Sequence, residues 1–290
     1  MTFIANSTFL ITGATDGIGK ALALALAQQG ATVVLHGRNP DKLAATVTEL
    51  RAATGNEQLH TVLADFSSLA QVAAMADEVS ERFSALNVLI NNAGHLTDHR
   101  QLSADGFELT FAVNYLAPFS LTLRLLDTLK NNSPARIVNV ASTALGGGDI
   151  DFNNLQLEQG FNGWQAYANS KLANALFSFE LARLLNGTDV VTNALCPGLI
   201  DTNFFHTNTV FANGAYERMQ PGMRSSEEGA LVPLYLATAP EAAGISGEFF
   251  IREGRDGRRM MPLGINPQMA EQLWTTSAGL TGTAGPIVPV

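Results

Sequence analysis

The chain of 290 residues has a single cysteine, Cys196, which excludes a disulfide within the chain. Such scarcity is typical of proteins in reducing compartments, and Cys196, at an expected strand end, is interpreted as a small packed residue. The sequence also has no uninterrupted apolar run of about 18 residues, the length that indicates a membrane span. Its N-terminus lacks the basic and then apolar pattern of a secretion signal. We therefore expect a soluble, cytoplasmic protein.

Basic residues are few as well. Lysine and arginine number 17 against 26 aspartates and glutamates, giving a net charge of −9 and a pI near 5.0. This balance disfavours nucleic acid and anionic membranes as partners. One basic cluster, interrupted by acidic residues, is expected to be a solvated or inter-subunit loop: Arg252, Arg255, Arg258 and Arg259.

Internal repeats, low-complexity blocks and linkers are also lacking, which argues for one domain over residues 1–278. The Gly-, Thr- and Pro-rich segment 279–290 is expected to be a loose tail or an arm that contacts a partner. Between Phe9 and Ile251, short apolar strands alternate with helical patterns. This alternation predicts an α/β fold, a parallel sheet covered by helices on both faces.

No metal site is expected. His95 and His99 are four residues apart, but they lie in a polar loop with no cysteine nearby. Substrate-loop or solvated imidazoles are the favoured interpretation. Asp149 and Asp151 follow three glycines, a flexible run that suits a substrate rim better than a carboxylate acid/base pair.

A glycine-rich loop joins an apolar strand at 7–11 to an Ala- and Leu-rich helix expected from about 20 to 29. In that context glycines permit a tight turn, approach of the backbone to a pyrophosphate, and close helix packing. The helix N-terminus also attracts phosphates. The spacing differs from the commoner G-x-G-x-x-G fingerprint, and an ordinary strand-to-helix turn is the alternative. The loop predicts these phosphate-binding residues: Gly13, Thr15, Asp16, Gly17, Ile18 and Gly19.

The second strand, at 32–36, indicates which dinucleotide is bound. In dinucleotide sites an acidic residue after this strand takes the ribose 2′-hydroxyl, whereas an arginine accommodates a 2′-phosphate. Here Gly37, Arg38 and Asn39 follow the strand, and the first carboxylate is Asp41. The pattern favours NADP(H), with NAD(H) as the alternative should Arg38 be a solvated loop cation.

Tyr167 and Lys171 stand four residues apart, so on a helix they share one face. A tyrosine has an ordinary pKa of about 10, and a nearby cation lowers that pKa by favouring the phenolate. The pair therefore predicts a proton shuttle. The same spacing also occurs on solvated helix faces, so its support comes from the other motifs.

Several motifs occur in the order typical of one family. The segment from Thr12 to Gly19 resembles a TGxxxGIG loop, and residues 91–94 resemble an NNAG motif after a strand at 88–90. Four further residues resemble a catalytic tetrad, Asn114, Ser142, Tyr167 and Lys171. Pro197-Gly198 follows a strand at 190–195. Over about residues 7 to 251, the chain resembles the short-chain dehydrogenase/reductase family.

The resemblance implies a doubly wound, mostly parallel, seven-stranded Rossmann sheet of order 3-2-1-4-5-6-7. It implies hydride transfer between a nicotinamide and a carbonyl or alcohol, with Tyr167 as proton donor or acceptor and Ser142 donating to the substrate oxygen. Lys171 would lower the pKa of Tyr167 and bind the nicotinamide ribose. Asn114 would keep its helix irregular, so that a backbone carbonyl holds a water. Further cofactor contacts are expected at Asp65, Phe66, Asn92, Ala93, Gly94, Pro197, Gly198 and Thr202.

More narrowly, residues 105–116, 150–152 and 167–174 resemble the branch that holds retinol dehydrogenases, WW-domain oxidoreductase and protochlorophyllide reductase. The stretch between Ser142 and Tyr167 is longer than in compact members of the family. Several vertebrate retinol dehydrogenases have an N-terminal membrane anchor, whereas about six residues precede the first expected strand here. We therefore do not expect membrane-bound retinoid chemistry.

The substrate is expected to lie under a lid at about 198–224, which contains Phe204, Phe205, Phe211, Tyr216 and Met219. These aromatics, with Phe161 and Trp164, either line an apolar cavity or pack the lid onto the body. A small apolar or aromatic carbonyl compound is the expected substrate. The alternatives are a redox-sensing regulator without turnover and a sugar-nucleotide epimerase or dehydratase. The chain is expected to be a monomer or a homo-oligomer.

Overall fold

The computed structural model describes residues 3–206, 208–212, 214–253 and 257–283. Its centre is a sheet with strand order β3-β2-β1-β4-β5-β6-β7-β8, in which every pair is parallel except β7 with β8. The strands span Thr8–Ile11 (β1), Thr32–Gly37 (β2), Leu59–Leu63 (β3), Leu86–Asn91 (β4), Ala135–Val140 (β5), Val190–Cys196 (β6), Phe249–Glu253 (β7) and Gly257–Met260 (β8).

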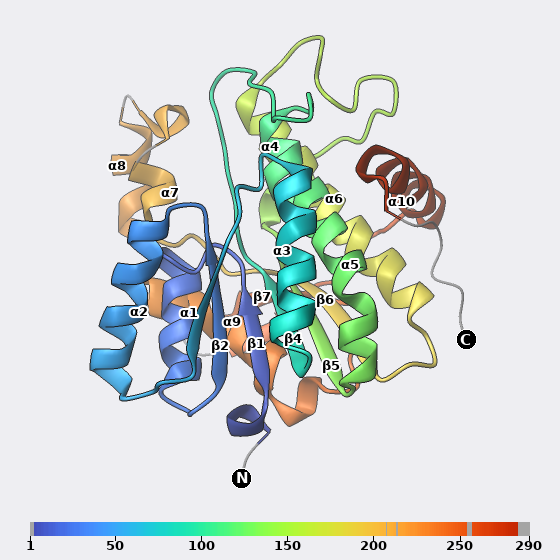
Figure 1. Cartoon of the computed structure of the whole chain (residues 1–290). Coiled ribbons are helices and arrows are strands. Elements are labelled where there is room, and N and C mark those ends of the chain that lie inside the picture. The colour runs from blue at the N-terminus through green and yellow to red at the C-terminus, as the bar shows by residue number, and fades with distance from the viewer. Residues whose placement is uncertain (1–2, 207, 213, 254–256, 284–290) are drawn as a thin grey trace.

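Helices cover both faces of this sheet (Figure 1). They span Gly17–Ala27 (α1), Pro40–Thr54 (α2), Leu69–Arg82 (α3), Leu109–Phe111 (α4), Ala117–Asn131 (α5), Gly163–Leu184 (α6), Asn203–His206 (α7), Ala215–Met219 (α8), Ser226–Thr238 (α9) and Pro267–Thr281 (α10). The order of the first seven strands confirms the expected doubly wound topology.

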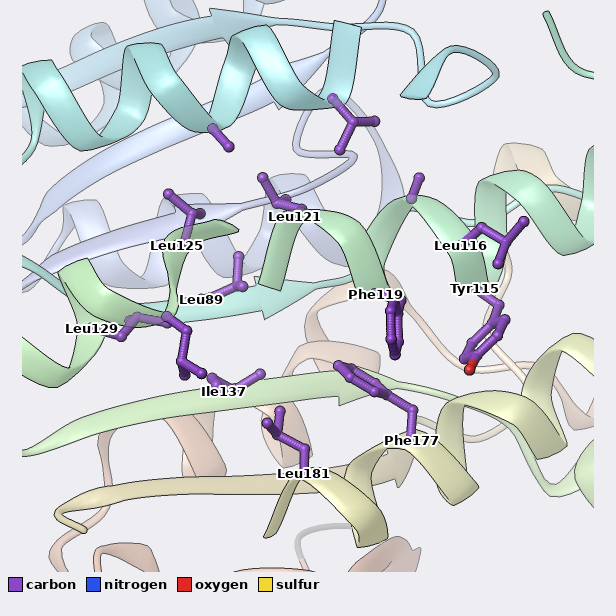
Figure 2. Packing of buried hydrophobic residues seen from close by; sticks show 14 of the residues in the cluster. Leu89, Tyr115, Leu116, Phe119, Leu121, Leu125, Leu129, Ile137, Phe177 and Leu181 are labelled. Atoms are coloured by element: carbon purple, nitrogen blue, oxygen red, sulfur yellow. The ribbon is translucent and has the colours of Figure 1, made fainter. Parts of the chain in front are cut away.

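The central strand β1 is mostly apolar because each face of the sheet carries its own core. Along β1, Phe9 and Ile11 lie in the core under α1, α2 and α9, whereas Leu10 lies in the core under α3, α5, α6 and α10. This is the two-residue alternation of a strand, buried on both sides. Figure 2 shows the second core, where Phe119 on α5 meets Phe177 on α6; their ring centroids are 5.3 Å apart.

The sheet has eight strands, so the expected number of seven is wrong by one. The added strand, β8, pairs antiparallel with β7 and contains Arg258 and Arg259. The part of the basic cluster that the structure describes is therefore an edge hairpin, not a loop, and Arg255 lies outside the described residues. The Arg258 guanidinium lies over the ring of Tyr235 at 3.4 Å from its centroid. This cation–π contact helps to stabilise an arginine-rich segment as a strand.

The expected boundary at residue 278 is also wrong, because α10 continues to Thr281. This helix packs on α5 and α6 through Trp274, whose ring lies 5.1 Å from that of Phe119 and 5.9 Å from that of Phe177. The hydroxyl of Tyr115 bonds that of Ser277 at 2.8 Å. The chain from 279 to 281 is thus part of the packed domain, and residues 284–290 lie outside the described part.

Within the described residues one helical stretch, Leu109–Asn131, has the length and mean hydropathy (1.3) of a membrane span. Its apolar residues are interrupted by polar ones, so it does not form a continuous apolar run. Moreover, 78% of its most apolar window is buried inside the protein, where it packs against α3 and α6. Burial in the core accounts for its apolar composition.

Candidate active site

A cavity of about 960 Å³ lies where the carboxyl ends of the parallel strands meet, the usual ligand position in such sheets. Nearly all of the residues expected to bind cofactor or substrate line it. Four of them are not among the lining residues: Gly19, Asn114, Phe161 and Tyr216. The structure therefore brings together side chains that are up to 189 positions apart in the chain, from Gly13 to Thr202.

The glycine loop takes the shape that the motif predicts. Gly13 and Gly17 have φ of +66° and +51°, a region that favours glycine. A Cβ at Gly13 would lie 2.9 Å from Cα of Ala93, and one at Gly19 would lie 2.2 Å from the carbonyl oxygen of Gly13. Helix α1 begins at Gly17, three residues earlier than expected, because the Asp16 carboxylate caps it by accepting from Gly17 N–H at 2.8 Å.

The loop after β4 is joined directly to the glycine loop. The Thr12 hydroxyl accepts from the backbone N–H of Asn92 at 2.9 Å and of Ala93 at 3.0 Å. The Asn92 side chain in turn donates to the carbonyls of Thr12 and Gly13, at 2.9 and 3.2 Å. These bonds hold both predicted cofactor-binding loops in one rigid unit along the cavity.

Asn114 lies in a π-helical turn, residues Ala112–Leu116, between α4 and α5. Its side chain binds both backbone groups of His95, accepting from N–H at 2.6 Å and donating to the carbonyl at 2.9 Å. It also donates to the hydroxyl of Ser170 at 2.9 Å. The expected irregular helix is thus present, and Asn114 ties it to the end of β4 and to α6.

Ser142, Tyr167 and Lys171 meet at one end of the cavity. The Ser142 hydroxyl accepts from Ala144 N–H at 3.1 Å and hydrogen-bonds the Tyr167 phenol. Lys171 Nζ lies 5.4 Å from the centroid of the Tyr167 ring and donates to the carbonyl of Val140 at 3.0 Å. A phenol, a hydroxyl and an ammonium therefore face the same space, the group needed to move one proton at a carbonyl oxygen.

Burial controls the ionisation of this pair. It lowers the pKa of Lys171 to about 8. It also raises the pKa of Tyr167 above its ordinary value, although the bond from Ser142 lowers it in part. This direction is opposite to the one expected from Lys171. The cost of removing a phenolate from water therefore dominates the pKa of this phenol.

The other end of the cavity is basic and aromatic. Arg38 and Lys42 line it near the end of β2 and the start of α2, and Asn39 caps α2 by accepting from Lys42 N–H at 2.9 Å. Asp65 and Phe66 line it after β3. Lys42 was not expected to contribute. Its place in the first turn of the helix that follows Arg38 could have indicated a second cation at this site.

Two histidines also line the cavity. His36 was not expected there, whereas His95 was expected to be a substrate-loop or solvated imidazole. His36, at the end of β2, is 3% exposed. His95 has its Nε2 atom buried with no hydrogen-bond partner among the described residues. Burial and the charge of Arg38 both lower the pKa of His95. A buried ring nitrogen without a hydrogen-bond partner in a cavity wall fits a ligand that has polar atoms of its own. Nothing in the sequence indicated that this nitrogen would be buried.

The segment expected to form a lid is an excursion from the sheet whose two ends lie side by side. Ile200 and Arg224 form a parallel bridge, and Asp201 N–H donates to Arg224 O at 2.8 Å. Figure 1 shows its helices, α7 and α8, beyond the end of the sheet opposite the N-terminus. Asn203 donates to Asp16 of the glycine loop, so the lid closes over the nucleotide end as well.

Both interpretations of the aromatic residues hold in part. The Tyr167 ring lies between Trp164 and Phe204, at 5.7 and 5.4 Å between centroids. Phe204, Phe205 and Phe211 line the cavity and also contact each other. Tyr216 donates to Asp201 at 3.2 Å and holds the lid together. Phe161 is not among the cavity-lining residues. The space in front of the phenol is therefore apolar and aromatic.

Comparisons with known proteins agree with this geometry. Residues 7–211 match the family model described as short chain dehydrogenase. Human retinol dehydrogenase 13 is 36% identical over 98% of the chain and 87% of its own length. Mouse polyprenol dehydrogenase is 34% identical over 95% and 84%.

Two solved structures have the same fold. An uncharacterised protein from Mycobacterium paratuberculosis has a TM-score of 0.78 and 32% identity, covering 99% of this chain and 97% of its own. An actinorhodin polyketide ketoreductase solved with NADPH has a TM-score of 0.70 and 26% identity, covering 87% and 97%.

Proposed function

Because the chain belongs to the short-chain dehydrogenase/reductase family and is thus a dinucleotide-dependent oxidoreductase, we propose that it prefers NADP(H) and acts on a carbonyl or alcohol group of a small apolar or aromatic compound. One observation carries the proposal. A single cavity joins a phenol, hydroxyl and ammonium group at one end to two cations, Arg38 and Lys42, at the other.

The cavity wall fits a dinucleotide. Glycines at 13 and 17 turn the backbone, and the N-terminus of α1 faces the cavity through Ile18, an arrangement that suits a pyrophosphate. The orphaned Nε2 of His95 is available to the adenosine half. Arg38 and Lys42 would hold the 2′-phosphate, since two cations and the absence of a carboxylate at Gly37 favour a charged ribose.

A bound nicotinamide supplies or accepts the hydride. Tyr167 holds its proton because burial raises the pKa of the phenol, which suits donation to an alkoxide as it forms during reduction. Ser142 hydrogen-bonds that phenol and accepts from Ala144 N–H, so its own O–H is placed to donate to the same substrate oxygen. Lys171 is positioned from behind by Val140 O, and Asn114 fixes α6 through Ser170.

The apolar substrate follows from the rings around the phenol. A carbonyl that reaches Tyr167 Oη would contact the nearby rings of Trp164 and Phe204. A polar substrate would lose its hydration there without gaining hydrogen bonds to these rings. Aromatic and alkyl carbonyls lose little on entering. Replacing Phe204 with Ala should raise KM for aromatic substrates more than for short polar ones.

The proposal is tested with a panel of aromatic, alkyl and polar carbonyls and alcohols, followed at the NADPH absorbance with NADH in parallel. We expect turnover of apolar carbonyls with NADPH, a weaker rate with NADH, and neither with Tyr167→Phe. Tight NADPH binding without turnover of any compound would favour the redox-sensing alternative. Equal rates with both dinucleotides would contradict the NADP(H) preference.

A further inference from the structure

His36 connects three strand ends under the cavity. Its Nδ1 accepts from the backbone N–H of Gly13 at 3.3 Å, and its Nε2 lies 3.1 Å from the carbonyl oxygen of Ala64. Its ring stacks on that of Phe66, with centroids 4.3 Å apart and 18° between the planes. One side chain of β2 thus contacts the glycine turn after β1 and the adenine-side segment after β3.

Only one form of the imidazole satisfies both hydrogen bonds. Ala64 O needs a proton on Nε2, whereas Gly13 N–H needs a lone pair on Nδ1. The ring must therefore be neutral with its proton on Nε2. Burial lowers the pKa of His36 to about 4, against a smaller raising effect of Asp65, so this neutral form persists at physiological pH.

We propose that His36 is a positioning residue for the adenosine half of the cofactor, which holds the Gly13 turn and the Asp65-Phe66 segment at a fixed separation. Its bond to Gly13 sets the position of the pyrophosphate loop. Its bond to Ala64 and its stack on Phe66 set the position of the segment that would face the adenine. The inference rests on the proposed dinucleotide function, but it concerns one end of the cofactor only.

This role predicts a separation between binding and chemistry. The phenol, Ser142 and Lys171 are held by β5 and α6, not by His36. Loss of His36 should then weaken binding of the adenosine half while the rate from the bound complex is kept. A general loss of folding would instead reduce both.

The experiment uses three variants of the full-length protein. His36→Leu removes both hydrogen bonds. The Oδ1 of His36→Asn takes the place of Nδ1 and keeps the bond from Gly13, whereas the Nε2 of His36→Gln takes the place of the ring Nε2 and keeps the bond to Ala64. Each is measured by titration with adenosine 2′,5′-bisphosphate, which lacks the nicotinamide, and by KM for NADPH and kcat.

For His36→Leu we expect Kd for the bisphosphate and KM for NADPH to rise about tenfold or more, because two buried polar groups lose their partners, with kcat within about twofold of wild type. The Asn and Gln variants should fall between Leu and wild type. His60→Leu is the matched control, since His60 lies on the adjacent strand β3 and outside the cavity lining, and it should leave Kd unchanged.

The inference is overturned if His36→Leu binds the bisphosphate as tightly as wild type does. It is also overturned if kcat falls and KM for NADPH rises together in all three variants. A failure of the proposed function is distinct from this. If wild type does not bind the bisphosphate but binds NADH, the NADP(H) preference is wrong. The same ranking of variants is then expected with NADH, because both cofactors share the adenosine that His36 positions.

Discussion

Thr202 of the lid lies against Gly17 of the glycine loop, so closely that a Cβ added at Gly17 would come within 2.9 Å of the Thr202 Cγ2 methyl group. Gly17 also has φ of +51°. Two separate constraints therefore require glycine here, one from the backbone and one from a segment 185 positions later in the chain. The closed lid and the phosphate loop form a single packed surface.

Replacing Gly17 with Ala should weaken NADPH binding by tenfold or more, because it adds backbone strain of roughly 1–2 kcal/mol and a collision with the lid. Thr202→Ser in the same chain lacks Cγ2 and should restore part of the affinity. Gly55→Ala is the control, since Gly55 has φ of +69° with nothing within 4 Å. Fluorescence titration with NADPH measures all three, and no recovery in the double variant would contradict the steric contribution.

Tyr167→Phe should bind NADPH with wild-type affinity but lose about 10²–10⁴-fold in kcat, the usual contribution of a positioned proton donor. Tyr115→Phe is a matched control, because its hydroxyl bonds Ser277 in α10. It should lower the free energy of unfolding by about 1 kcal/mol and leave kcat unchanged. Wild-type turnover in Tyr167→Phe would remove the proton role.

Arg38→Asp should shift the ratio of kcat/KM for NADPH to that for NADH by at least tenfold toward NADH, because a carboxylate repels the 2′-phosphate and accepts from the 2′-hydroxyl. Arg124→Asp makes the same change in net charge on α5, on an exposed side chain, and should leave the ratio unchanged. If the ratio shifted equally in both variants, the cause would be a general charge effect, and Arg38 would not determine the cofactor preference.

The stability of the protein should fall in acid partly through His36. Its pKa is about 4 in the folded protein against 6.5 ordinarily, so between these values the unfolded chain binds more protons. Its contribution to the free energy of unfolding is complete above about pH 6.5 and is lost as pH falls toward 4, by up to roughly 3 kcal/mol.

Urea unfolding at pH 7 and pH 4.5 measures this loss, and His36→Asn should lose less stability than wild type between the two. Glu108 contributes with the opposite sign, since burial raises its pKa, but it is present in both proteins and cancels in the difference. An identical acid loss in the variant would refute the assignment to His36.

The sequence predicted the features that depend on local spacing. The apolar run of β1, the glycines that need positive φ, and the four-residue spacing of Tyr167 and Lys171 all carry their structural meaning within a few positions. Ordered along the chain, they were sufficient to predict the family and the parallel strand order. The roles of the individual site residues stay predictions until variants are measured.

The remaining features depend on contacts between distant segments. β8 is short and rich in arginine, so nothing local marked it as a strand, and it exists because β7 and Tyr235 provide partners. Helix α10 continues past the expected end because Trp274 packs on α5 and α6 and Ser277 bonds Tyr115 in the π-helical turn.

The sequence by itself determined which chemical groups would gather at the carboxyl ends of the strands, because strand order places them there whatever the side-chain details. Only the tertiary structure decided their ionisation and their partners. Burial, which is a property of the whole packed domain, raises the pKa of Tyr167 where a neighbouring ammonium alone would lower it. It also gives His36 two backbone partners that lie 23 and 28 positions away in opposite directions along the chain.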